Sequence, residues 1–372
     1  MLEIKNLSKI YATPNGPLAA LRDVNVQVGK GDIFGFIGLS GAGKTSLARC
    51  VSVLERADAG AILLNGVDLT RLKGANLRQA RRNMGMVFQH FNLLMNATIF
   101  ENVAFPLRIA GWPQKEITAR VEHLLEVVGL TDKVKTYPAT LSGGQKQRIG
   151  IARALAAEPQ LIICDEATSA LDPDTTRSIL TLLKKINADT GVTIIVITHE
   201  MDVIKTLCSH VAVMEGGEII EQGKVIDVLT HPQTETARRF FAKDHSEEGW
   251  FKAVQENKIG HQVFRAVFIG AAARRSFIHD VIRNFDIELS ILSGSIESVS
   301  GTMVGSLIIE MTGDDAVLAK AMAFFRENGV EIEAIEGMET ANPTDATYPT
   351  ESIDSATCKD TVGSYEGGVP HA

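Results

Sequence analysis

The sequence predicts an α/β fold with a mainly parallel sheet, followed by a smaller α+β domain. Through most of the first 240 residues, buried-strand patterns alternate with helical patterns. Such alternation is typical of a parallel sheet that is covered by helices on both faces. A later segment shows the order strand, helix, strand, strand, helix, strand, which is typical of the ferredoxin-like fold.

Length and composition favour a globular protein with more than one domain. At 372 residues the chain is longer than one hydrophobic core usually organises, so we expect two domains. Hydrophobic residues make up 45% of the chain and charged residues 22%. No apolar run approaches the roughly 20 residues that cross a bilayer, and the first residues lack a signal-peptide pattern. We therefore expect the chain to stay in the cytoplasm.

Charge and cysteine usage argue against two further classes. Most of the net charge of −8 lies in the last segment, 339–372, and the mildly acidic remainder gives no electrostatic footprint for nucleic acid. Cys50, Cys164, Cys208 and Cys358 form neither a CxxC pair nor a Cys/His cluster, so neither a disulfide framework nor a zinc site is indicated. We expect three of these cysteines to pack as small hydrophobic residues.

The first domain is expected to span residues 1–240. Helical spacing without strand signals over about 91–158 predicts a helical subdomain inserted into the α/β unit. A helix is expected over 173–191, and hairpin turns are expected at Asn65-Gly66 and Gly216-Gly217. The strands are expected at 2–7, 21–28, 32–39, 60–69, 84–89, 160–167 and 192–200.

A second domain is expected at 259–338, after a polar connector at 241–258. Its predicted elements are strands at 262–269, 288–299, 302–312 and 330–335, with helices at 276–285 and 314–329. The tail, 339–372, is rich in Thr, Ser, Asp, Pro and Gly and has little to bury, so we expect it to be disordered.

A glycine-rich loop lies between the strand 32–39 and the helix that follows it. Gly38, Gly43, Lys44 and Thr45 match the pattern G-x-x-x-x-G-K-[ST]. Glycines let backbone N–H groups approach a triphosphate, the helix N-terminus adds partial positive charge, and the lysine reaches the β and γ phosphates. The threonine is expected to hold Mg²⁺. The alternative is a plain strand-to-helix turn with an exposed lysine. The loop residues expected to bind the nucleotide are Gly38, Ser40, Gly41, Ala42, Gly43, Lys44, Thr45 and Ser46.

Two carboxylates follow a later buried strand, in "LIICDEATSALD". Asp165 lies at the end of this strand, where it is expected to bind Mg²⁺ through the hydration shell. Glu166 follows it as a candidate general base for an attacking water. An acidic strand end that is merely exposed to solvent is the alternative.

A third motif, "LSGGQKQR", covers residues 141–148 and precedes an apolar-periodic helix. A hydroxyl and open backbone amides at a helix start again favour anion binding. The residues concerned are Ser142, Gly143, Gly144 and Gln145. One phosphate chain does not need two such sites from one molecule unless they close on it from opposite sides. An ordinary capped helix is the alternative.

These three motifs, in this order, resemble those of ATP-binding cassette ATPases, the nucleotide-hydrolysing subunits of ABC transporters. The resemblance covers residues 1 to about 240 and implies a P-loop NTPase with a RecA-like core and an inserted helical subdomain. It implies ATP and Mg²⁺ as cofactors, and Lys44, Glu166, His199 and Gln89 as catalytic residues.

The resemblance also assigns roles to isolated residues. Gln89 matches a glutamine that touches Mg²⁺ and links to the membrane subunit, and Ser169 and Asp172 match the loop that crosses the dimer interface. His199 matches the switch histidine beside the γ-phosphate, and Tyr11 matches the aromatic residue that stacks on adenine. The alternatives are a structural histidine, a tyrosine that only packs, and a surface amide.

In this family two cassettes face each other head to tail. The resemblance therefore implies a homodimer in which Ser142 and Gly144 serve the partner's γ-phosphate. It implies two copies of a multi-spanning membrane permease docked near Gln89. The expected location is the cytoplasmic face of the inner membrane.

The stretches "FQHFNLL", "TIFENVAFPL", "CDEATSALDPDTTRSIL" and "THEMDVIK", with the C-terminal unit, resemble methionine-importer ATPases. The resemblance implies methionine uptake from an external binding protein, and a C-terminal domain that binds methionine and inhibits transport. The resemblance implies a carboxamide at position 290, where this chain has Ser290, and the loss of that amide would remove hydrogen-bonding capacity for a regulatory ligand. A dimerisation module without ligand, an importer for another amino acid or peptide, and a non-transport cassette ATPase remain open.

Overall fold

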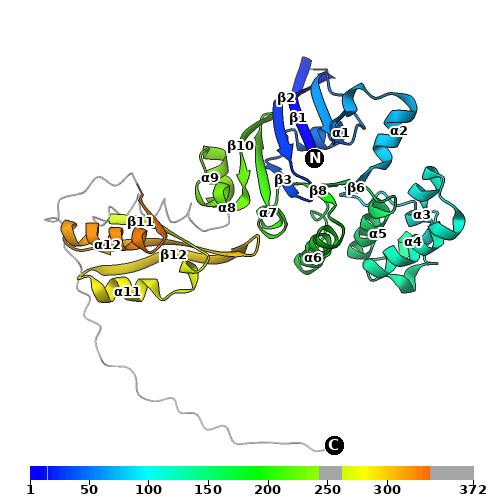
Figure 1. The fold of residues 1–372 in the computed structure, drawn as a ribbon. Coiled ribbons are helices and arrows are strands. Elements are labelled where there is room, and N and C mark those ends of the chain that lie inside the picture. Colours follow the sequence, from blue (N-terminus) through cyan, green and yellow to red (C-terminus); the bar gives the residue numbers. More distant parts are fainter. Residues whose placement is uncertain (15, 243–261, 336–372) are drawn as a thin grey trace, which may run out of the picture.

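The computed structural model describes residues 1–14, 16–242 and 262–335. Residues 1–242 form the N-terminal domain and 262–335 form the C-terminal domain (Figure 1). The strands of the N-terminal domain are β1 (Leu2–Thr13), β2 (Gly16–Val28), β3 (Ile33–Gly38), β4 (Ala59–Leu64), β5 (Val67–Asp68), β6 (Met84–Phe88), β7 (Leu161–Asp165), β8 (Thr193–Thr198), β9 (His210–Glu215) and β10 (Glu218–Lys224). Its helices are α1 (Lys44–Val51), α2 (Gly74–Arg82), α3 (Ile99–Ala110), α4 (Gln114–Val127), α5 (Gly143–Leu155), α6 (Pro173–Thr190), α7 (Met201–Leu207), α8 (Val225–Thr230) and α9 (Glu235–Ala242).

The central sheet has six strands in the order β10-β9-β3-β8-β7-β6. Strands β9, β3, β8, β7 and β6 are parallel, and β10 pairs antiparallel with β9. The register pairs Phe88 with Asp165, and Asp165 with Ile197. It also pairs Ile37 with Thr198. Because the carboxyl ends of parallel strands meet at one edge, the glycine loop and the residues that follow β6, β7 and β8 share this edge.

A second, antiparallel sheet has the order β2-β1-β4-β5. Helix α1 is buried against it and against the central sheet, since its Leu47 and Val51 share one core with Leu2, Ile62 and Phe36. Such burial on both sides fixes the start of α1, and with it the glycine loop. Cys50, Cys164 and Cys208 are buried, which confirms the expectation that three cysteines pack as hydrophobic residues; Cys358 lies outside the described residues.

Residues 89–160, all of them described, form α3, α4, α5 and short 3-10 turns and contain no strand. Apolar residues of the three helices, including Val103, Leu124 and Ile151, share one core with the central sheet. Thr98 caps α3 through a capping box with Glu101. Among the described residues, no helix has the combined length and apolar character that a membrane crossing requires.

The C-terminal domain has the strand order β12-β13-β11-β14, antiparallel throughout. Its two helices cover one face, where Phe264, Phe277 and Phe325 form the core. This arrangement confirms the ferredoxin-like prediction, with bounds close to those expected. The elements are β11 (Gln262–Ile269), α11 (Phe277–Asn284), β12 (Glu288–Val299), β13 (Thr302–Thr312), α12 (Asp315–Glu327) and β14 (Val330–Ala334). The tail 339–372 and the connector 241–258, apart from 241 and 242 at the end of α9, lie outside the described residues.

The first hairpin is longer than the sequence predicts. Strands were expected at 2–7 and 21–28, whereas β1 runs to Thr13 and β2 begins at Gly16. The register shifts between Ile4 and Ile10 break the alternation of inward and outward side chains, which hides the strand from pattern analysis. The extension carries Tyr11 to the site described below.

Candidate functional site

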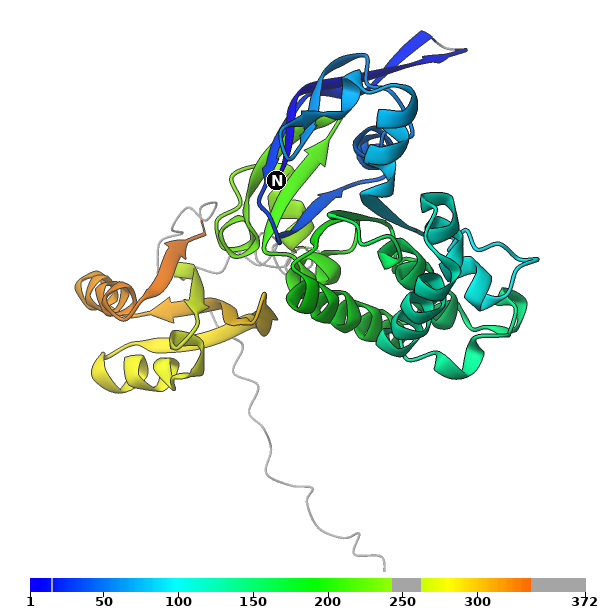
Figure 2. The same cartoon turned by 45° about the vertical axis from the view of Figure 1, so that its right-hand side comes forward.

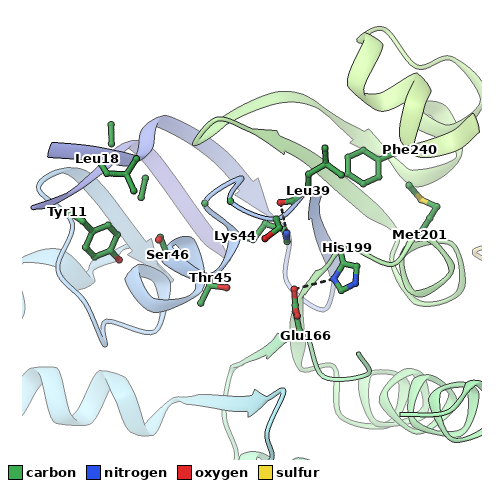
Figure 3. Close-up of a pocket in the computed structure, with 15 residues that line it drawn as sticks. Tyr11, Leu18, Leu39, Lys44, Thr45, Ser46, Glu166, His199, Met201 and Phe240 are labelled. Atoms are coloured by element: carbon green, nitrogen blue, oxygen red, sulfur yellow. Dashed lines mark hydrogen bonds and ion pairs between the residues drawn. The ribbon is translucent and has the colours of Figure 1, made fainter. Parts of the chain in front are cut away.

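A cavity of about 730 Å³ opens at the carboxyl edge of the central sheet (Figure 3). The glycine loop and the start of α1 form its floor, and the β1–β2 hairpin, Glu166, His199 and α9 form its sides. The lining residues that the sequence predicts for the site are Tyr11, Ser40, Gly41, Gly43, Lys44, Thr45, Ser46, Glu166 and His199. The structure therefore brings together residues that lie up to 188 positions apart in the chain.

The glycine loop needs two of its glycines for close backbone contacts. A Cβ atom on Gly38 would lie 2.4 Å from the Met214 carbonyl oxygen, and one on Gly43 would lie 2.3 Å from the Ala20 carbonyl oxygen. Gly43 also has φ 96° and stands at the N-cap of α1, where no side chain caps the helix. The first N–H groups of α1 are thus left without a capping side chain beside the cavity, as an anion site requires.

Lys44 is buried and bends back over the loop that precedes it. Its Nζ donates hydrogen bonds to the carbonyl oxygens of Gly38 (2.7 Å) and Leu39 (3.0 Å). Burial lowers the pKa of this amine, while the nearby carboxylates Glu166 and Asp165 act in the opposite direction. The ammonium group therefore lacks full solvation and gains from an anionic partner such as a phosphate.

Asp165 is the group in this site that fits a divalent cation. Its Oδ1 is buried and has no hydrogen-bond partner among the described residues. Burial, followed by the charge of Glu166, raises the pKa of this carboxyl above its ordinary value. A hard cation supplies the missing partner of such an oxygen and favours its ionised form. Thr45 lines the adjoining cavity, and the half-buried Gln89 directly follows Phe88, the register partner of Asp165.

Glu166 and His199 face each other beside the cavity (Figure 3). His199 Nδ1 lies 3.3 Å from Glu166 Oε1, and their side chains are 51% and 22% exposed. Glu166 has φ 48°, a left-handed conformation that costs energy in a residue other than glycine. Its N–H donates to the Ile197 carbonyl of the neighbouring strand, which holds the strained backbone in place. A carboxylate at this position can activate a water that enters the cavity.

Tyr11 is held on two sides. Its hydroxyl donates a hydrogen bond to Glu55, whose other carboxylate oxygen lies 2.9 Å from Arg49 of α1. Lys9 Nζ lies 5.3 Å from the centre of the Tyr11 ring. The ring thus lines the cavity in a defined orientation, as stacking on a base requires. Pattern analysis missed Glu55, because nothing local in the sequence marks it as a partner of a tyrosine 44 positions away.

The residues of the third motif, Ser142 to Gln145, are called the signature below, and they form a separate, self-capped helix start. Ser142 Oγ accepts from the Gln145 N–H (3.3 Å), and Gln145 Oε1 accepts from the Ser142 N–H (3.0 Å). A Cβ atom on Gly144 would lie 2.4 Å from Thr175 of α6, so only glycine fits there. None of the signature residues lines the nucleotide cavity, and α5 is grouped with α3 and α4 (Figures 1 and 2).

The loop "SALD", residues 169–172, leads from the segment after β7 into α6, and it links Glu166 to the signature helix α5 only through contacts. Ser169 donates from its N–H (3.3 Å) and its Oγ (3.1 Å) to the Glu166 carbonyl oxygen. Asp172 caps α6 by accepting from the Thr175 N–H (2.9 Å). Since Thr175 also contacts Gly144, the loop connects the backbone of Glu166 to the signature through a short series of contacts.

Other lining residues lie outside every motif. Leu39, Met201 and Phe240 form an apolar wall next to His199 (Figure 3). Only tertiary packing brings α9 to this place, so no signal in the sequence could have identified Phe240. In the C-terminal domain, Ser290 is exposed on β12, whereas its neighbour Ile291 lines a separate cavity of about 300 Å³. Side chains alternate along a strand, so Ser290 lies on the other face.

Comparisons with known proteins agree with this geometry. The model of the ABC transporter family matches residues 21–169, and the model of the NIL domain matches residues 262–334. The chain is 46% identical over 335 residues to a methionine import ATP-binding protein MetN of Symbiobacterium thermophilum, covering 90% of this chain and 99% of that protein. It is 47% identical over 340 residues to the MetN protein of Photobacterium profundum, with the same coverage.

Solved structures show the same cassette. A dimeric structure of the ATP-binding cassette MJ0796 in a post-hydrolysis state with ADP and Pi is 33% identical, with a TM-score of 0.57. The match covers 60% of this chain and 99% of that chain. The structure of cbiO1 from Clostridium perfringens, part of an ABC transporter complex, is 28% identical with the same TM-score, and the match covers 68% and 98% of the two chains. The chain therefore belongs to the methionine import ATP-binding protein family, with an ABC transporter cassette followed by a NIL domain.

Proposed function

We propose that the chain hydrolyses MgATP as a homodimer and thereby drives methionine import through a membrane permease. One observation carries this proposal: the cassette holds a complete nucleotide-binding half-site, with Lys44, Glu166 and His199 around one cavity. The names of the relatives supply the substrate, because they are methionine import proteins over nearly their full length.

The chain's own groups have distinct tasks in hydrolysis. Lys44 and the open N–H groups of α1 bind the phosphates, while Thr45, Asp165 and Gln89 would hold a magnesium ion, which would supply positive charge against the phosphates. Glu166 takes a proton from the attacking water. His199, already in contact with Glu166, steadies the γ-phosphate and the carboxylate together.

A homodimer explains why the signature lies away from the cavity. Ser142, Gly143 and Gly144 lie at a helix start that presents backbone N–H groups. In the single chain these residues do not line the nucleotide cavity. Head-to-tail pairing of two copies places each signature opposite the other copy's glycine loop. The related cassette MJ0796 is a dimer in its solved structures, which supports this arrangement.

The permease is proposed to dock in a groove of about 620 Å³ between α2, β6 and α3. Leu94, Phe105 and Ile109 are large apolar side chains that remain 41%, 46% and 55% exposed in this region. Arg78, Arg81, Arg82 and Arg153 also line the groove. An apolar surface with basic groups, which includes Phe88 directly before Gln89, fits a short cytoplasmic helix of a membrane subunit. This fit supports the proposal that the chain works at the cytoplasmic face of the membrane.

The C-terminal domain is proposed to bind methionine as a regulatory ligand. Its cavity is apolar at Phe268, Phe277 and Leu307, and Arg275 and His279 stand among its lining residues. An apolar pocket with the cationic side chain of Arg275 suits methionine, because the thioether side chain can contact the apolar residues and the carboxylate can pair with the arginine. Ser290 lies on the other face of β12 and is not among the residues that line this cavity, so its identity does not decide whether the cavity binds methionine.

Uptake of radiolabelled methionine tests the transport function. Cells that lack the chain are supplied with the wild type or with Lys44→Ala, and competition by other amino acids and by peptides reports the substrate. We expect uptake only with the wild type and competition mainly by methionine. Uptake restored equally by Lys44→Ala would refute the ATPase role, and competition by a different amino acid would refute the substrate. Calorimetry of the full chain with methionine tests regulation, and absence of heat at millimolar ligand would refute methionine as a regulatory ligand of the C-terminal domain and favour a dimerisation role.

A further inference from the structure

The C-terminal domain contacts the ATPase domain at the helix that follows His199. Helix α7 begins at Met201, two residues after this histidine. In Figures 1 and 2 the tip of the β12–β13 hairpin lies beside α7. Helix α7 also contacts β3, the strand that leads into the glycine loop, since a Cβ atom on Gly35 would lie 2.4 Å from Ile204. The helix therefore lies between the nucleotide site and the second domain.

The hairpin tip supplies hydrogen bonds to the end of α7. The Ser300 N–H donates to the Lys205 carbonyl oxygen (2.8 Å), and Ser300 Oγ donates to the Cys208 carbonyl oxygen (2.6 Å). Carbonyl groups in the last turn of a helix have no partner within the helix and need one from elsewhere. With only seven residues α7 is too short to be stable by itself, so this cap from the other domain contributes to its order.

The turn that makes these contacts is strained. Ser300 has φ 50° and Gly301 has φ 87°, which are the left-handed values of a two-residue hairpin turn. Such turns favour Asn or Gly at the first position, and serine at this conformation is unusual. A strained residue that makes two hydrogen bonds to another domain points to a role for that contact.

An ion pair and apolar packing accompany the cap. Lys205 Nζ lies 2.8 Å from Glu297 Oε2, with side chains 6% and 32% exposed. Val299 and Val304 are buried in the same core as Val203 of α7. A largely buried ion pair with additional hydrogen bonds tolerates little displacement, so the hairpin and α7 move together.

The opposite end of α7 lies beside α9, the last described helix of the ATPase domain. The Phe240 ring of α9 lies between Leu39 and Met201, next to His199 (Figure 3). Helix α9 ends at Ala242, where the described part of the ATPase domain ends. The start of α7 thus contacts α9, and the end of α7 contacts the β12–β13 hairpin of the C-terminal domain.

We propose that the hairpin tip, Val299–Gly301, is a latch that acts within one chain: it holds α7, and with it His199, so that the placement of the C-terminal domain sets the rate of ATP turnover. Ser300, Glu297 and Lys205 are its positioning residues. The effect on turnover rests on the proposed role of His199, whereas the effect on α7 does not.

The test uses the full chain with Ser300→Gly and Glu297→Lys, and it measures kcat, KM for MgATP and amide hydrogen exchange over 201–208. Ser300→Gly keeps the turn and its N–H but removes the hydroxyl bond. We expect kcat to fall about two- to fivefold, as loss of one hydrogen bond permits, with KM unchanged and faster exchange in α7.

Glu297→Lys is expected to lower kcat more than Ser300→Gly does. Adding Lys205→Glu swaps the two charges and should partly restore kcat. Ser298→Ala, which removes an exposed hydroxyl from the same hairpin, is the matched control and should match the wild type.

Wild-type exchange over 201–208 in both variants would overturn the latch. Faster exchange with unchanged kcat would overturn its control of turnover. The variant His199→Ala separates the two proposals: if it leaves kcat unchanged, the proposed role of His199 fails, while the exchange measurement still decides whether the hairpin holds α7.

Discussion

Helices α1 and α5 both begin with glycines at a proposed phosphate site, but they begin in different ways. Helix α1 follows a left-handed Gly43 and opens into a cavity beside a buried lysine. Among the described residues, α1 has no side-chain cap and the buried Oδ1 of Asp165 has no hydrogen-bond partner. Helix α5 follows Ser142, and its capping box with Gln145 provides partners within the chain for the N–H groups of Ser142 and Gln145. None of the described residues that line the nucleotide cavity comes from the start of α5.

The difference indicates which site a single chain can complete. In the α1 site, burial disfavours the charged forms of Lys44 and Asp165. These two groups therefore destabilise the fold when no ligand is bound, and a ligand of opposite charge removes this cost. The α5 site is stable without a ligand and acquires a second function only when another surface approaches it. Catalysis on this view needs one site of each kind from two copies.

The largest expected effect is that of Glu166→Gln. The amide keeps the shape of the side chain but cannot accept the proton of the attacking water, so turnover should fall about 10²- to 10⁴-fold. ATP binding should persist, because the glycine loop and Lys44 are unchanged. Size-exclusion chromatography with MgATP should then show a dimer.

If the variant stayed monomeric with MgATP, the proposed role of α5 would fail, because α5 would then not complete the nucleotide site of a second copy. Normal hydrolysis by the variant would instead remove Glu166 from the role of base. Lys44→Ala, which loses nucleotide binding, is the control that should stay monomeric.

Substitutions of Ser142 separate its capping role from its phosphate role. Ser142→Asp keeps a good N-cap but places a negative charge toward the partner's phosphate, so we expect turnover to fall more than tenfold with unchanged thermal stability. Ser142→Ala should lower stability by about 1 kcal/mol as well as turnover. Thr98→Ala removes the matching capping box of α3 and should lower stability alone. Full activity of Ser142→Asp would show that α5 is only a capped helix.

Substitution of Glu55 tests the part of the α1 site that holds the base. Glu55→Ala releases the Tyr11 hydroxyl and should weaken ATP binding about two- to tenfold, by loss of a charge-assisted hydrogen bond that orients the ring. Binding of inorganic triphosphate, which carries no base, should not change. Tyr11→Phe, which loses the same hydrogen bond but keeps the ring, is the matched variant. Equal losses for ATP and triphosphate would mean that Glu55 supports the loop rather than the base site.

The smallest effect concerns the stability of the protein without ligand. Because burial raises the pKa of Asp165 in the folded state, its ionised form destabilises the fold at neutral pH, and Asp165→Asn should raise the melting temperature by about 2–4 °C. As the pH falls through this raised pKa, the wild type takes up the proton preferentially in the folded state and the difference should vanish. With MgATP bound, the wild type should have the higher melting temperature, because its Asp165 carboxylate can then pair with the magnesium ion. A lower melting temperature of the variant at neutral pH would show that Asp165 is stabilising and has a partner.

Much of the site could be predicted because its signals are local. The glycine pattern around Lys44, the carboxylates after a buried strand, the capping box at Ser142 and the alternating strands of the C-terminal domain each depend on residues within a few turns of one another. The hairpin turns at Asn65-Gly66 and Gly216-Gly217 are confirmed for the same reason, since each places two left-handed residues in sequence.

Tertiary structure alone decided which of these local features meet. The register of β6, β7 and β8 puts Gln89, Asp165 and His199 at one edge of the sheet, the long first hairpin brings Tyr11 to Glu55, and folding of the C-terminal domain onto α7 places Ser300 at its end. A pattern of residues states what a segment prefers to become. It does not state which distant segment will cover it, because that choice depends on the packing of the whole core, to which each residue contributes only a small part of the free energy.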